Sequence, residues 1–108
     1  MEFWDESLHM ARVEHKCDAC RQIIAVGQKY AYMVGKFDGE FFTVKQHTEC
    51  RAAEVAIAQE KGLFGGEDWV HLNDLDEPDD LLWLREEHPV VFERIREQYS
   101  DWLEEEAA

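Results

Sequence analysis

The chain has 108 residues, 12% of them aromatic, and a formal net charge of −14. This length fits one domain or a small module with an extension, and the aromatic content excludes a disordered chain. No apolar run approaches the roughly 20 residues of a membrane helix, and the acidic start at residues 1–6 lacks the basic residues of a secretory signal. We therefore expect a cytoplasmic protein.

The negative charge is concentrated in the second half of the chain. Residues 1–51 contain seven basic and eight acidic side chains and sum to −1, whereas residues 52–108 contain four basic and 17 acidic and sum to −13. An acidic surface repels phosphate backbones and membrane headgroups and attracts basic patches. The sequence thus predicts a near-neutral first part followed by a strongly acidic one.

The first 16 residues are expected to form an extended segment that leads to the first cysteine motif. His15 lies two residues before that motif, and we expect it to be an ordinary exposed histidine because the ligand set is complete without it. The apolar residues that suggest the extended segment are Leu8, Met10 and Val13.

Two ligand pairs with two-residue gaps follow. Cys17-x2-Cys20 is separated by 26 residues from His47-x2-Cys50, and the two pairs use every cysteine in the chain. Three thiolates and one imidazole make the closed tetrahedral shell that structural zinc prefers. We predict one structural Zn²⁺ bound by these four residues. An odd number of cysteines in this spacing also favours a reducing compartment over disulfides.

A β-hairpin is predicted between the two ligand pairs. Residues Tyr30–Phe37 are rich in strand formers, and Glu40–Lys45 form a second such run. The Asp38-Gly39 pair between them is the strongest short hairpin signal. We expect the two runs to pair as antiparallel strands.

A helix is predicted over Glu49–Lys61, which contains neither glycine nor proline. Thr48 is expected to cap its start, and Gly62 is a natural C-terminal cap. Cys50 then lies in the first turn. The expected inner face carries Ala53 and Ile57, with Val55 and Ala56 on its flanks.

A knuckle, a hairpin and a helix in this order describe the treble-clef zinc fold. The segment resembles the zinc finger of poly(ADP-ribose) polymerases and, more loosely, LIM-type fingers. This resemblance implies the treble-clef fold and the four metal ligands, and fingers of the polymerase type bind DNA breaks through basic and apolar residues around the zinc. It covers about a third of the chain. The residues that carry it are Cys17-x2-Cys20, Ile24, Gly27, Phe37-Asp38-Gly39 and His47-x2-Cys50.

The acidic part begins with a connection over residues 62–79. Trp69, Val70 and Leu72 are expected to form a short extended piece packed on the core, and His71 is expected to be a surface or core histidine rather than a ligand. Asp76 is expected to cap the helix that follows, with Pro78 near its first position.

That helix is expected to stop before Pro89, because the residue before a proline is pushed out of the helical region. Pro89 then begins a final helix with His88 near its cap. One apolar stripe is predicted along this helix, formed by Val91, Phe92, Ile95, Tyr99, Trp102 and Leu103. The opposite, exposed face is predicted to carry Glu93, Arg94, Arg96, Glu97 and Asp101. Leu81, Leu82, Trp83 and Leu84 are the expected apolar face of the preceding helix.

The expected fold class is therefore α+β, with a treble-clef finger over residues 1–62 and an acidic extension over residues 63–108. The two amphipathic helices of the extension are expected to pack on the finger, so that the chain forms one compact unit. A closed zinc shell leaves no position for substrate, and no cysteine remains free as a nucleophile. We do not expect an enzyme.

A non-catalytic interaction protein is the favoured function. Acidic side chains can occupy a site built for DNA or RNA, and in size and acidity the chain resembles small phage-type proteins that mimic nucleic acid and inhibit DNA- or RNA-handling or defence enzymes, which would place it in the host cytoplasm. The alternative is that acidity only keeps the chain soluble. The predicted partner surface comprises Glu67, Asp68, Asp74, Asp76, Glu77, Asp79 and Asp80.

Direct nucleic-acid binding by the finger is the second functional hypothesis. Neutralising several phosphates requires a clustered basic surface. The residues that can supply it are Arg21, Lys29, Lys36 and Lys45.

Overall fold

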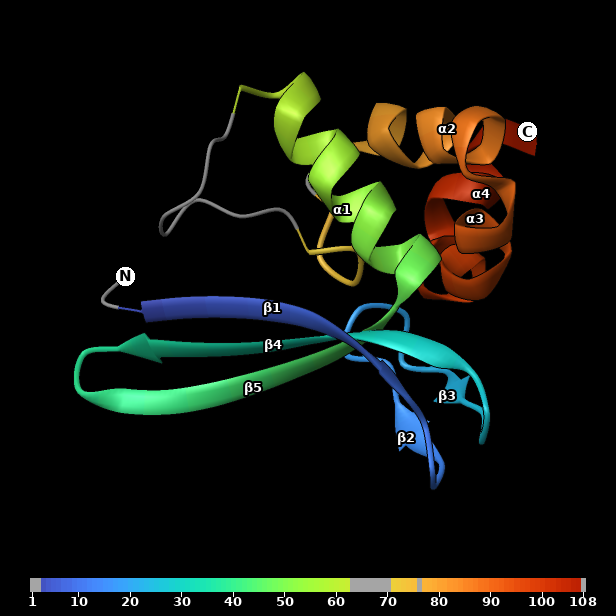
Figure 1. The fold of residues 1–108 in the computed structure, drawn as a ribbon. Coiled ribbons are helices and arrows are strands. Elements are labelled where there is room, and N and C mark those ends of the chain that lie inside the picture. Colours follow the sequence, from blue (N-terminus) through green and yellow to red (C-terminus); the bar gives the residue numbers. More distant parts are fainter. Residues whose placement is uncertain (1–2, 63–70, 76, 108) are drawn as a thin grey trace.

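The computed structural model describes residues 3–62, 71–75 and 77–107 (Figure 1). A three-stranded sheet lies beneath helix α1, and the remaining helices stack beside α1, away from the tip of the sheet. The elements in chain order are β1 (Phe3–Met10), β2 (His15–Lys16), β3 (Ile23–Ile24), β4 (Lys29–Phe37), β5 (Glu40–His47), α1 (Thr48–Glu60), α2 (Pro78–Glu87), α3 (Pro89–Ile95), the 3-10 helix η1 (Arg96–Tyr99) and α4 (Ser100–Ala107).

The predicted hairpin is present as β4 and β5. The two strands are antiparallel and pair from Tyr30 opposite His47 to Phe37 opposite Glu40. Asp38 and Gly39 both have positive φ, at 53° and 83°, as a two-residue turn matched to the twist of the strands requires. Strand β5 is two residues longer than expected, so it delivers His47 directly to the start of α1.

The N-terminal segment is a full strand of the sheet rather than a simple lead-in. Strand β1 pairs antiparallel with β4 over eight residues, which gives the order β1-β4-β5. At the far end of the sheet, Trp4 and Phe42 lie with ring centroids 6.1 Å apart. Gly35 lies between them in the register, where a Cβ atom would come within 2.4 Å of the Phe42 ring. The glycine therefore makes room for the aromatic pair.

A small two-stranded sheet holds the first cysteine pair. His15 and Lys16 in β2 pair with Ile24 and Ile23 in β3. Arg21 closes the turn with φ of 67°, and its N–H donates to the Cys17 carbonyl at 2.9 Å. This left-handed position completes the tight turn that presents both cysteines on one side.

Helix α1 begins one residue earlier than predicted, because the strand runs straight into it. His47 occupies the N-cap position, and no side chain caps the helix there. The expected cap by Thr48 is therefore wrong: Thr48 is the first helical residue, and its hydroxyl donates to the Glu49 carboxylate at 3.3 Å. The helix ends at Glu60, one residue before the predicted end, and the expected role of Gly62 is confirmed, since it follows the helix with φ of 75° and its N–H donates to the Gln59 carbonyl.

The inner face of α1 contains one buried charge that the apolar pattern did not indicate. Ala53 and Ile57 are buried as expected, and Glu54 between them is 1% exposed. The Glu54 carboxylate accepts hydrogen bonds from the Gln46 side-chain amide at 2.9 Å and from the Leu72 backbone N–H at 3.1 Å. Leu72 is buried as predicted, but it lies in a turn rather than in an extended piece. Trp69 and Val70 lie outside the described residues.

The two prolines define the boundaries of α2 and α3 as predicted. Pro78 is the first residue of α2, which ends at Glu87, and His88 is the N-cap residue of α3. Glu77 occupies the N-cap of α2, and Asp76, the expected cap, lies outside the described residues.

The prediction of one final helix is wrong, because it divides into α3, η1 and α4. Tyr99 at the end of η1 explains the change. Its hydroxyl donates to the Leu72 carbonyl at 2.6 Å and accepts from the Leu75 N–H at 2.9 Å. The tighter turn lets the chain meet these two fixed backbone groups.

One cluster of buried residues joins the sequence before and after residue 62. The metal-motif cysteines and Ile57 belong to it together with Leu72, Leu84 and Ile95. The apolar stripe of the last helices is confirmed, since Val91, Phe92 and Ile95 are buried and the later members pack against the same cluster. The core therefore lies between α1, the knuckle and the C-terminal helices, next to the ligand motif.

Candidate metal centre

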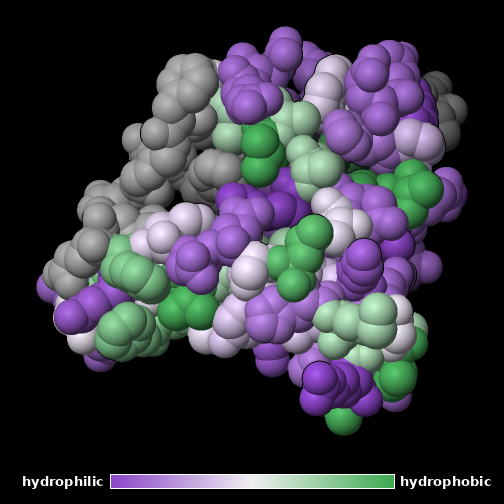
Figure 2. Space-filling view, viewed as in Figure 1, coloured by the Kyte–Doolittle hydropathy of each residue, from purple (hydrophilic) through white to green (hydrophobic). Residues whose placement is uncertain are grey.

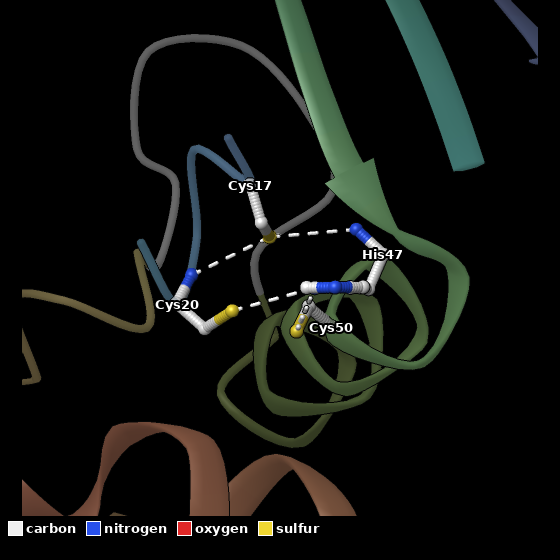
Figure 3. Close-up of side chains that lie close together, drawn as sticks. All are labelled: Cys17, Cys20, His47 and Cys50. Carbon is white, nitrogen blue, oxygen red and sulfur yellow. Dashed lines mark hydrogen bonds between the residues drawn. The ribbon is translucent and has the colours of Figure 1, made fainter. Parts of the chain in front are cut away.

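The four predicted ligands converge at one buried point (Figure 3). Cys17 and Cys20 come from the turn between β2 and β3, His47 from the end of β5, and Cys50 from the first turn of α1. The three sulfur atoms and one imidazole nitrogen all lie within 4.8 Å of one another, and none of the four residues is more than 2% exposed.

The ligand atoms lie close enough together to hold one metal ion. With bonds of about 2.3 Å to sulfur and about 2.0 Å to nitrogen, a tetrahedral zinc shell places its ligand atoms about 3.5–3.8 Å apart. His47 Nδ1 lies 3.3 Å from Cys20 Sγ and 3.7 Å from Cys50 Sγ. A donor set of three sulfurs and one nitrogen is of the type that zinc prefers.

Backbone amides point at the sulfur atoms. The Cys20 N–H donates to Cys17 Sγ at 3.5 Å, the Gln22 N–H donates to Cys20 Sγ at 3.5 Å, and the His47 N–H donates to Cys17 Sγ at 3.4 Å. Such donors stabilise thiolates, which are the form of cysteine that binds a metal. The turn therefore provides both the ligands and part of their charge stabilisation.

The tautomer of His47 is fixed by its second nitrogen. Nε2 lies 3.0 Å from the Ile23 carbonyl oxygen, which can only accept, so Nε2 carries the hydrogen and donates it. Nδ1 then has a free lone pair directed at the three sulfurs. An imidazole whose outer nitrogen is bonded to a carbonyl is the usual arrangement of a metal-binding histidine.

The three thiols shift one another's pKa values in opposite directions. The hydrogen bond from the Cys20 thiol lowers the pKa of Cys17, and the hydrogen bond with Cys17 raises the pKa of both Cys20 and Cys50. By themselves the thiols thus favour one thiolate at a time. Three thiolates in so small a volume require a cation between them, which the ligand geometry is suited to hold.

Arg94 is a component of the site that sequence reasoning missed. The sequence places it on the exposed face of the last helix, but its side chain is only 18% exposed and its guanidinium lies 3.7 Å from Cys50 Sγ. Burial alone lowers the pKa of Arg94, but the hydrogen bond to Cys50 and the charges of Cys50 and Glu49 outweigh burial and raise it. No local pattern could have indicated this contact, which joins residues 44 positions apart.

The predicted acidic surface is described only in part. Asp74, Glu77 and Asp79 are exposed, whereas Glu67, Asp68 and Asp76 lie outside the described residues. Asp80 differs from the prediction: its side chain is 18% exposed and forms an ion pair with Lys61 at 2.9 Å. This pair joins α2 to the end of α1, so Asp80 serves the fold rather than the open surface.

The predicted basic residues do not form one patch. Lys29 and Lys36 stand seven residues apart on β4, so they project from opposite faces of the sheet about 23 Å apart. Lys36 and Lys45 share the face away from α1, and Lys36 lies over the Phe41 ring at 5.4 Å. Arg21 is exposed at the turn that carries the cysteines.

Two of the four histidines outside the ligand set, His15 and His71, also lie away from it. His15 is half-buried, with its ring 5.2 Å from that of Tyr30, and His71 is exposed. Both therefore agree with the prediction that neither is needed as a ligand, although His15 is less exposed than expected.

In the described part of the chain, none of the helices has the length and apolar character needed to cross a membrane.

Comparisons of the chain with models of protein families, with curated proteins and with solved structures found no match.

Proposed function

We propose that this chain is a non-catalytic, zinc-stabilised interaction protein whose acidic C-terminal helices bind a basic partner surface. The observation that carries the proposal is the convergence of four buried ligands, Cys17, Cys20, His47 and Cys50, on one point. Such a shell is complete, so the metal has no open position for water or substrate and acts as a structural cross-link. A small acidic chain gains from it a rigid frame.

The order of the ligands along the fold supports a treble-clef assignment. One pair lies on a tight turn, and the second pair spans the end of a hairpin strand and the first turn of a helix. Zinc is the proposed metal because borderline-soft ligands in a tetrahedral set select it among the abundant divalent ions. The need to keep the three cysteines reduced supports a cytoplasmic location.

The charge on the C-terminal helices supports a basic partner. In Figure 2 the surface over α2 is coloured largely as hydrophilic. The cations of this region are partly engaged within the chain, since Lys61 pairs with Asp80, Arg94 with Glu49, and Arg96 with Glu93. The exposed carboxylates on the described residues of this half are Glu60, Asp74, Glu77, Asp79, Glu86, Glu87, Glu93, Glu97, Asp101 and Glu104.

The partner we propose is a protein whose basic surface otherwise binds nucleic acid. Carboxylates fixed on short helices present negative charges at defined positions, as a phosphate backbone does, and steer basic surfaces towards them. Occupying that surface would inhibit a DNA- or RNA-handling or defence enzyme without any chemistry by this chain.

A charge-reversal experiment tests this function. Asp74, Glu77 and Asp79 are replaced together by lysine, and Asp5, Asp38 and Glu40 on the sheet are replaced together as a control with the same change in net charge. Proteins retained by the immobilised wild-type chain should also be retained by the control variant, but the variant with lysine at positions 74, 77 and 79 should no longer retain them. They should be displaced by added duplex DNA, because both compete for one basic surface.

Two results would contradict the proposal. One is equal retention of the same proteins by the variant with lysine at positions 74, 77 and 79 and by the control variant. The other is direct, salt-dependent binding of a labelled DNA duplex by the purified wild-type chain, which would favour nucleic-acid binding through the basic residues of the finger.

A further inference from the structure

The C-terminal helices reach into the surroundings of the metal ligands at three points. The Arg94 guanidinium on α3 donates to Cys50 Sγ at 3.7 Å and to the Glu49 carboxylate at 3.4 Å. The Gln22 side-chain amide donates to the Arg94 carbonyl at 2.9 Å. The Gln98 amide on η1 donates to the Cys20 carbonyl at 3.3 Å. The same short segment therefore contacts both ligand-bearing parts of the finger.

Arg94 lies beside two groups that can carry negative charge, the ligand Cys50 and the carboxylate of Glu49. Zn²⁺ with three thiolates and a neutral imidazole carries a net charge of −1, and the Glu49 carboxylate adjacent to it adds another negative charge. Arg94 places one positive charge beside these two negative charges, from a side chain that is 18% exposed. A hydrogen bond from a guanidinium to a thiolate is charge-assisted and stronger than one to a neutral thiol.

We propose that Arg94 is the positioning residue that couples metal binding in the finger to docking of the C-terminal helices. The inference rests on the proposed structural metal. It extends the role of that metal from the finger to the helices that present the acidic surface. Arg94 on α3 bonds both the ligand Cys50 and its neighbour Glu49, so docking of α3 orders the ligand set, and an ordered ligand set in turn holds α3 in place. The two effects are reciprocal, as linkage requires.

Zinc affinity of matched variants provides the test. Wild type, Arg94→Gln, Arg94→Lys and Arg96→Gln are compared by competition with a chelator under reducing conditions. Arg96 is a suitable control because it lies two residues away, is 51% exposed and pairs with Glu93. Loss of an outer-shell donor should weaken zinc binding about 10- to 100-fold in Arg94→Gln, and Arg96→Gln should stay within about twofold of wild type.

A spectroscopic readout separates positioning from general stability. In the Co²⁺-loaded proteins, losing a donor to a thiolate should shift the sulfur-to-metal charge-transfer band of Arg94→Gln and leave that of Arg96→Gln unchanged. Arg94→Lys should restore part of the zinc affinity, because an ammonium group keeps the charge but cannot bond Cys50 and Glu49 with a planar fork. Equal affinity and equal spectra for Arg94→Gln and Arg96→Gln would overturn the proposal.

If Arg94→Gln does not fold, a measurement on the wild-type chain still tests the proposal. In the zinc-loaded protein, the side-chain N–H hydrogens of Arg94 should exchange slowly with solvent and those of Arg96 rapidly. Equally rapid exchange would contradict the coupling. Absence of stoichiometric zinc in the wild type would instead overturn the proposed function, so the two failures are distinguishable.

Discussion

Glu6 and Arg51 join the edge strand β1 to helix α1 at the level of single residues. The Arg51 guanidinium donates to both carboxylate oxygens of Glu6, at 2.8 and 3.2 Å. The Arg51 hydrogen bond lowers the pKa of Glu6 below its ordinary value of 4.5, although partial burial opposes the shift. A lowered pKa means that folding favours the ionised carboxylate, so this pair stabilises the fold at neutral pH.

Glu6→Gln should therefore lower the free energy of unfolding at pH 7, by less than about 1 kcal/mol because the pair is partly exposed. The folded state binds this proton less tightly than the unfolded state. The stabilisation is thus present above pH 4.5 and is lost as the pH falls through the folded-state pKa of Glu6. Urea midpoints of wild type and variant should converge as the pH is lowered through this range, and Glu40→Gln serves as an exposed control. A difference that widens with acidity would refute this account of Glu6.

The ligand residues could be predicted from the sequence, whereas their partners could not. Each ligand pair is local, and a two-residue gap is itself the geometric requirement of a tight turn. The contact of Arg94 with Cys50 and that of Glu54 with Leu72 join residues far apart in the chain. On a helix such residues look like any other charged position until the packing of the neighbouring element is known.

At the scale of elements, Tyr99 determines where the last helix breaks. One hydroxyl serves two backbone groups of the turn at residues 72–75, the Leu72 carbonyl and the Leu75 N–H. Its ring also stacks on Trp102 with centroids 5.0 Å apart. Leu72 and Leu75 are both buried, so the turn and the 3-10 helix stabilise each other.

Tyr99→Phe should lower the free energy of unfolding by about 1–3 kcal/mol, because it leaves a donor and an acceptor in the turn without a partner. Urea unfolding of the zinc-saturated protein measures the loss, and the Leu75 amide should exchange faster with solvent. Tyr32→Phe, on the sheet face away from α1, is the matched control. An equal, small loss in both variants would contradict the assigned role of Tyr99.

The Tyr99 effect should also depend on pH. Burial raises the pKa of Tyr99 above its ordinary value of 10.0. The contribution of the neutral hydroxyl is therefore complete below pH 10.0 and is lost as the pH rises through the folded-state pKa. The stability difference between wild type and Tyr99→Phe should therefore shrink in alkali.

At this scale, the sequence predicts an element correctly when the signal for it acts between neighbouring residues, and fails when the element depends on distant ones. The Asp38-Gly39 turn and both prolines act on neighbouring residues, and the structure agrees with each. Strand β1 depends on pairing with β4, whose partner residues lie 19 to 33 positions later in the chain. The apolar alternation of β1 is blurred because most of its side chains are exposed. The division of the final helix depends on a turn that precedes α2, so periodicity alone predicted one continuous element.

At the scale of the whole molecule, the metal is expected to dominate stability. Structural zinc contributes about 10–16 kcal/mol of binding free energy in small fingers at neutral pH. The whole free energy of unfolding of an ordinary domain is of similar size, about 5–15 kcal/mol. The core around the ligands is small, and the surplus of acidic side chains opposes compaction through mutual repulsion. Loss of the metal should therefore unfold the finger and release the helices docked on it.

The most direct test is metal stoichiometry combined with removal of the metal. Native mass spectrometry of the reduced, purified chain should show one zinc per chain, and chelation should abolish the near-ultraviolet circular dichroism of its aromatic residues. Adding Zn²⁺ should restore that signal in wild type but not in Cys17→Ser or Cys50→Ser. A chain that binds no stoichiometric zinc, or that keeps its signal and thermal midpoint after chelation, would contradict the claim that a metal bound between the knuckle and α1 holds this fold together.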